Sequence, residues 1–156
     1  MTYFHEEQQF RDSWLWLAIA IPMAIAVWAL LTTPGAPVSA AIAVVGVTIA
    51  VAALIGLARL ETVVTDEAVV VRFHGLWPTR RIPLAEVAEY TPMHYGMWDS
   101  GGWGVHLGLA GMTYNVSGNE GIHFRLKRGA KVLVGTQRPA EFAAAVAKAM
   151  ETRTPG

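Results

Sequence analysis

The sequence contains no cysteine, which excludes disulfide bonds, thiolate metal sites and a cysteine nucleophile. Charge is also scarce, because Asp, Glu, Lys and Arg make up 15% of the 156 residues, whereas about 25% is usual for soluble domains. Twelve basic and twelve acidic residues give a formal net charge of zero, so the composition does not favour a nucleic-acid partner. A part of the chain that avoids water would explain the low charge.

Two long apolar runs, 14–31 and 38–58, provide that part. A bilayer core about 30 Å thick needs about 20 apolar residues in a helix, so each run is long enough to cross it. The sequence therefore predicts a transmembrane helical hairpin over 14–58. Neither run contains an ionisable residue, which argues against an ion path or a proton relay and favours a simple anchor.

The orientation of the hairpin follows from the basic residues beside it. Arg11 precedes the first run and Arg59 closes the second, whereas the connecting segment 32–37 contains no Lys or Arg. Basic flanks stay in the cytoplasm, so we expect both termini there, with 1–13 as a cytoplasmic N-terminal segment. A cleaved signal peptide is the alternative, but the acidic residues before the first run and the length of that run argue against it.

Small residues recur at helical spacing along the second run, and such rows let helices approach closely. The hairpin partner or another subunit could use them, although small residues are common in membrane helices in general. They are Ala40, Val44, Gly46, Thr48, Ala50, Ala52 and Gly56.

After Arg59 the pattern changes to short alternating segments that are typical of β-strands. We expect about seven strands in one domain over 59–151, at 60–65, 68–74, 79–83, 85–92, 103–109, 122–127 and 131–136. One helix follows, because Pro139 suits a first helical position and an apolar stripe includes Phe142 and Val146. Residues 152–156 are expected to be a tail.

This element order, together with several local segments, resembles small bacterial membrane proteins that carry a bacterial pleckstrin-homology (PH) domain. The segments that carry the resemblance are 65–73, 81–87, 101–104, 114–118 and 132–139. The resemblance implies an α+β membrane protein whose two-helix anchor leads into a PH-like antiparallel β-barrel or sandwich with one C-terminal helix. It also implies a place in the bacterial inner membrane and a role in scaffolding, lipid contact or assembly.

A glycine-rich stretch, 93–121, is the most unusual local feature of the expected domain, and its aromatic residues have two possible roles. They could form a surface that recognises another protein, another subunit or the membrane interface. They could instead be core residues of a small, strongly bent sheet, which the turn-forming glycines favour. The aromatic residues are Tyr95, Trp98, Trp103 and Tyr114.

Basic residues of the domain suggest a second surface, because each Lys or Arg near an anionic leaflet contributes about 1 kcal/mol to membrane binding. The candidates for lipid contact are Arg72, Arg80, Arg81, Lys127 and Arg128. They support an anionic-lipid-binding module as an alternative function.

Catalytic and metal-binding signals are weak. The histidines lack metal-ligand spacing, so we expect no metal and no cofactor. Asp99 and Ser100 place a hydroxyl beside a carboxylate but do not form a nucleophile elbow, so a membrane-bound hydrolase that uses Ser100 and His106 is a remote alternative. The favoured function is a non-enzymatic homo-oligomer or protein-docking module at the cytoplasmic membrane face.

Overall fold

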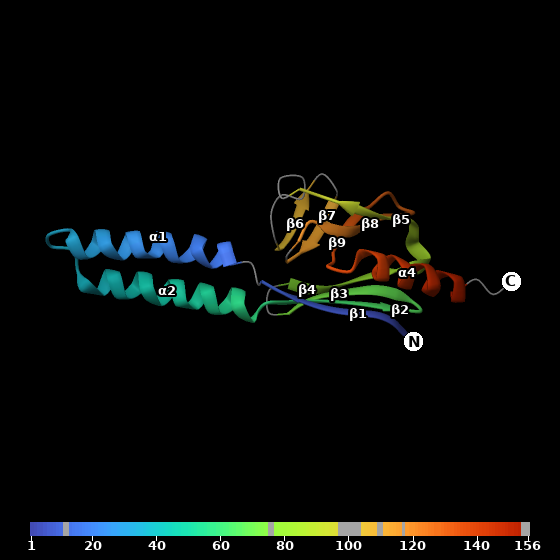
Figure 1. Cartoon of the computed structure of the whole chain (residues 1–156), viewed down its shortest axis with the longest axis horizontal. Helices are drawn as coiled ribbons and strands as arrows, with labels where there is room; N and C mark the ends of the chain where they lie inside the picture. Colours follow the sequence, from blue (N-terminus) through green and yellow to red (C-terminus); the bar gives the residue numbers. More distant parts are fainter. Residues whose placement is uncertain (11–12, 75–76, 97–103, 109–110, 117, 154–156) are drawn as a thin grey trace. The chain divides into compact units, whose positions relative to one another are not determined.

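The computed structural model describes residues 1–10, 13–74, 77–96, 104–108, 111–116 and 118–153. The chain divides into two compact units, one formed by Phe10–Ala58 and the other by Met1–Gln9 together with Arg59–Gly156 (Figure 1). The second unit combines β-strands with a C-terminal helix, so the expected α+β class is confirmed.

Phe10–Ala58 contains two long apolar helices, as predicted. They are α1, Ser13–Thr32, and α2, Val38–Leu57, and both are long and apolar enough to cross a membrane. At the end of α1, the hydroxyls of Thr32 and Thr33 donate hydrogen bonds to the carbonyls of Trp28 and Ala29. The Ala29 carbonyl also accepts the backbone N–H of Thr33 at 3.1 Å, so the Thr33 hydroxyl gives it an additional bond, in a connection that carries no charge.

The first sheet of the other unit is an antiparallel meander in which each strand pairs with its neighbours in the chain. Inward residues alternate with exposed ones along its second strand, where Leu60, Thr62 and Val64 are buried. Its strands, in spatial order, are β1, Thr2–Gln9, β2, Arg59–Thr65, β3, Ala68–His74, and β4, Trp77–Pro83.

Strand β1 was not expected, because the sequence interpretation placed these residues in an N-terminal segment outside the domain. Its inward residues are Phe4, Glu6 and Gln8, and two of these three are polar. A strand whose buried face is mostly polar does not show the alternation by which strands are predicted. The domain therefore begins before the helical hairpin and resumes after it.

The second sheet has the strand order β5-β8-β9-β7-β6, with β7 and β9 parallel and the other pairs antiparallel. The parallel pair departs from the purely antiparallel sheet that was expected. Residues 85 and 86, expected in a strand, belong to a 3-10 turn, η1, Leu84–Glu86. The strands are β5, Val87–His94, β6, Gly104–Gly108, β7, Gly111–Asn115, β8, Glu120–Leu126, and β9, Lys131–Gly135.

The C-terminal helix α4, Pro139–Arg153, contacts strands of both sheets and lies between them (Figure 1). The ring of its Phe142 is fully buried, stacks on Phe4 at 5.0 Å and contacts Phe124 at 5.9 Å between centroids. Burying such a side chain contributes about 1.5–3 kcal/mol. These rings join β1, α4 and β8 in one core.

A buried polar network also attaches β1 to the segment that leads into α4. The Glu6 carboxylate accepts hydrogen bonds from the Thr136 hydroxyl at 2.5 Å, the Gln137 amide at 3.0 Å and the Gln8 side chain at 3.3 Å. Gln8 also donates to the Gly135 carbonyl at 2.9 Å. A buried carboxylate is stable only when its oxygens are satisfied, so this network fixes the position of β1.

Candidate functional site

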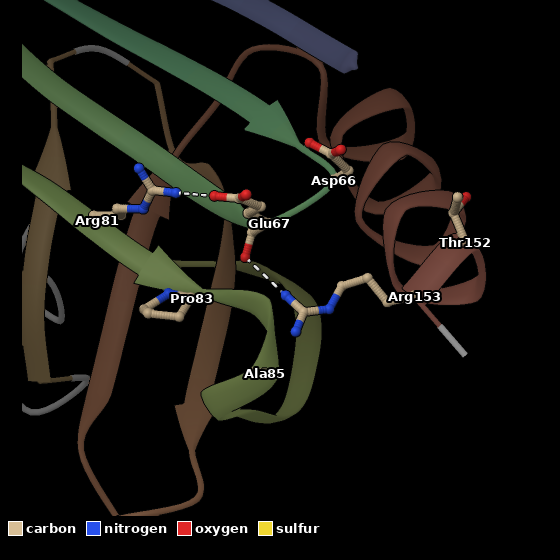
Figure 2. A pocket seen from close by; sticks show the side chains of 7 residues that line it. All are labelled: Asp66, Glu67, Arg81, Pro83, Ala85, Thr152 and Arg153. Carbon is tan, nitrogen blue, oxygen red and sulfur yellow. Dashed lines mark hydrogen bonds and ion pairs between the residues drawn. The ribbon is translucent and has the colours of Figure 1, made fainter. Parts of the chain in front are cut away.

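An open pocket lies where the β2–β3 turn, the end of β4 and the C-terminal turn of α4 meet. Its volume is about 640 Å³, and Figure 2 shows the residues that line it. The turn supplies Asp66 and Glu67, and α4 supplies Thr152 and Arg153. The remaining lining residues are Arg81 and Pro83 of β4 and Ala85 of η1.

Each charged residue of this pocket has a hydrogen-bond or ion-pair partner, and Glu67 and Arg81 pair with each other. The carboxylate of Glu67 accepts a hydrogen bond from Arg81, and the backbone carbonyl of Glu67 accepts one from Arg153 at 3.0 Å (Figure 2). Asp66 lies 3.2 Å from the N-terminal ammonium group, and the hydrogen bond to that group holds the pKa of Asp66 below its ordinary value. The pocket can therefore hold a polar group against two arginines, and its described lining offers no nucleophile with a neighbouring base.

A smaller hollow of about 300 Å³ adjoins the pocket and shares Ala85 and Arg153 with it. Lys127 lines this second hollow, so the turn after β8 brings a third cation to the end of α4. Arg81 and Lys127 are among the residues predicted to contact lipid, whereas Arg153 was expected in the tail and was not predicted.

The five residues predicted to contact lipid do not form one patch. Arg72 lies on the outer face of the first sheet and is paired with Glu61. Arg80 is opposite Val71 in the ladder, on the face that carries the core, whereas Arg81 is opposite Val70 on the other face. Arg128 lies in the turn between β8 and β9.

The predicted aromatic surface is corrected for two of its four residues. Tyr95 and Tyr114 are each 3% exposed and belong to the core, as the alternative interpretation of this segment proposed. Burial raises the pKa of both tyrosines, although the nearby Arg80 opposes the shift at Tyr114. Trp98 and Trp103 lie outside the described residues, as does Ser100, and the side chain of His106 is not described either.

A charged cluster on the outer face of the first sheet was not foreseen. Glu61 of β2 lies 3.1 Å from His74, 3.3 Å from Arg72 and 3.3 Å from His5, so strands β1 and β3 both supply partners. The hydrogen bond from His74, followed by the effects of Arg72 and His5, lowers the pKa of Glu61, and partial burial opposes them. Predicting this cluster required the strand register, and β1 was not identified from the sequence.

No group of three or more His, Cys, Asp or Glu side chains in the described part of the chain is arranged to hold a metal ion. Comparison of the chain with family models, with curated proteins and with solved structures gave no match.

Proposed function

We propose that this chain is a non-enzymatic, membrane-anchored module. In this proposal, α1 and α2 cross the bacterial inner membrane as a hairpin and hold a PH-like domain at its cytoplasmic face. The domain acts in self-assembly or in docking another protein. The observation that carries the proposal is the position of two uncharged apolar helices between two paired strands of one sheet.

The pairing of β1 with β2 supports an even number of membrane crossings. β1 precedes the helices and β2 follows them, yet the two strands are hydrogen-bonded from Thr2–Thr65 to Gln9–Arg59. Paired strands must lie on one side of a membrane, because an open sheet edge is not tolerated in lipid. A hairpin meets this condition, whereas cleavage at 38–40 would separate β1 from the domain. The basic residues Arg11 and Arg59 favour the cytoplasmic side.

The two sheets with the C-terminal helix α4 between them support the PH-like description. The segments on which the resemblance depends include most of β3 and β9 and the start of α4. The described strands outnumber the expected seven, because β1 and β7 were not predicted.

Strand β6 offers an interaction surface for assembly. It lies at the edge of its sheet and pairs only with β7 in the described part of the structure. Its Leu107 is 81% exposed, so this edge strand presents a large apolar side chain that the described residues leave uncovered. An open edge with an apolar side chain favours addition of a strand from a second copy of the chain.

Light scattering coupled to size exclusion of the full chain in detergent tests this function. We expect an oligomer, and we expect Leu107→Glu to shift it towards the monomer by placing a charge at the contact. Thr91→Glu is the matched control, because Thr91 is exposed on β5, the opposite edge of the same sheet. A wild-type monomer with no co-purifying protein would overturn the proposal.

A further inference from the structure

The chain enters and leaves the helical hairpin at one end of the first sheet. β1 ends at Gln9 and β2 begins at Arg59, and these two residues are opposite each other in the ladder. Only Ala58 separates Arg59 from Leu57, the last residue of α2. Consecutive Cα atoms are about 3.8 Å apart, so Arg59 lies within about 7.6 Å of the end of α2 at any angle between helix and strand.

The strand register places two more residues at this same end. His74, at the end of β3, is opposite Arg59, and Trp77, at the start of β4, is opposite Phe73. Trp77 is 49% exposed on an edge strand, although Trp side chains are usually largely buried. We call Arg59, His74 and Trp77 the hairpin-proximal edge.

We propose that the hairpin-proximal edge rests in the headgroup region of the bilayer, with the Trp77 indole as the contacting group. This inference rests on the proposed insertion of α1 and α2. The indole has an apolar body and one N–H donor, and such rings favour the membrane–water interface.

The charges of the edge do not select anionic lipid. Arg59 has Glu7 at 3.9 Å, and His74 faces Glu61, which also binds Arg72 and His5. Cation and carboxylate therefore largely cancel on the outer face of the sheet, which carries Arg59 and His74, whereas Trp77 is opposite the buried Phe73 and lies on the other face. The contact then depends on Trp77 and on the covalent link, which keeps the edge at a high effective concentration near the lipid.

The other end of the same strands provides an internal control. β2 runs from Arg59 to Thr65, and at about 3.3 Å per residue its far end lies about 20 Å from its start. Glu67 follows in the exposed turn at that end. A probe at Glu67 therefore reports on the same domain far from the proposed contact.

Because the chain has no cysteine, single-cysteine variants label one site without further changes. The full chain carries a nitroxide at Thr79→Cys, Glu67→Cys or Ile25→Cys in phosphatidylcholine vesicles with and without phosphatidylglycerol. Thr79 is exposed and lies two residues from Trp77, and Ile25 is an exposed residue of α1. Power saturation then measures the accessibility of each label to oxygen and to a water-soluble nickel chelate.

We expect the chelate to reach the label at 79 severalfold less than the label at 67, in both types of vesicle. Adding Trp77→Ala should raise its access at 79 to that at 67, and circular dichroism checks that the fold is kept. Equal access at 79 and 67 with a shielded label at 25 would overturn the inference but leave the hairpin inserted. A label at 25 that the chelate reaches freely would overturn the anchor itself. Shielding at 79 only with phosphatidylglycerol would refute the role of Trp77.

Discussion

Glu6 tests whether strand β1 belongs to the folded domain. Glu6 is 6% exposed, and its carboxylate accepts the hydrogen bonds of Thr136, Gln137 and Gln8. A hydrogen bond to a charged group contributes about 1.5–3 kcal/mol, and these three share one acceptor group, so their contributions do not add fully. Because removal of Glu6 leaves buried donors unpaired, we expect Glu6→Ala to lower the free energy of unfolding by about 3 kcal/mol or more.

Pulse proteolysis in urea measures this loss on the full chain in detergent micelles. With a urea dependence of about 1.5 kcal/mol/M, a loss of 3 kcal/mol lowers the midpoint by about 2 M. Glu7→Ala is the matched control, because Glu7 is the next residue of β1, half exposed and 3.9 Å from Arg59, and an exposed pair contributes at most about 1 kcal/mol. If the two variants unfolded at the same urea concentration as the unmodified chain, β1 would not be anchored as described.

A double-mutant cycle locates the source of the Glu6 effect. Thr136→Val removes the hydroxyl that donates to Glu6 while keeping the shape of the side chain. Combined with Glu6→Ala, it should cause a smaller loss than the two single changes together, by about 0.5–3 kcal/mol. Additive losses would show that the two groups do not interact.

Three further changes test other parts of the domain by the same urea assay. Gly111→Ala should lower the free energy of unfolding by more than about 1 kcal/mol, because Gly111 has a φ of 89° and an added Cβ would meet a backbone carbonyl of β9. Gly118 has a similar φ, but an added Cβ would meet no described atom, so Gly118→Ala should lower the free energy of unfolding by less. Tyr95→Phe should leave the neutral-pH midpoint unchanged or raised, since no described atom pairs with the buried hydroxyl. Because burial raises the Tyr95 pKa, the variant should also lose less stability as the pH rises above 10. The pKa of Glu61 is lowered in the folded chain, so Glu61 stabilises the fold above its ordinary pKa of 4.5, and this stabilisation is lost as the pH falls through the folded pKa. In Glu61→Gln the urea midpoint should therefore fall less between about pH 5 and pH 3 than in the unmodified chain. An equal fall in both proteins would contradict this.

The sequence predicted elements whose buried face is apolar. The two helices of the hairpin, α4 and the strand with buried Val69, Val71 and Phe73 follow directly from apolar periodicity. β1 was missed because Glu6 and Gln8 occupy its inward face. β7 was missed because it lies in the glycine-rich stretch and pairs in parallel with β9, and such a contact leaves no local pattern.

The candidate site was predicted less well, because its residues depend on register. Arg80 and Arg81 were both predicted to contact lipid. They are consecutive in a strand, however, and strand alternation alone would have placed them on opposite faces. The pocket in Figure 2 combines the β2–β3 turn, β4 and α4, and only tertiary structure brings these together. The Glu61 cluster likewise needs three aligned strands.

The insertion of the hairpin between β1 and β2 also determines when the domain can fold during synthesis. β1 leaves the ribosome before α1 and α2, but its partner strand begins only at Arg59, after both helices have been made. The groups that bind Glu6, in Thr136 and Gln137, are synthesised later still. Translation therefore completes both helices before the domain can close, and the buried carboxylate of Glu6 finds its partners only after the strands that follow the helices have been made.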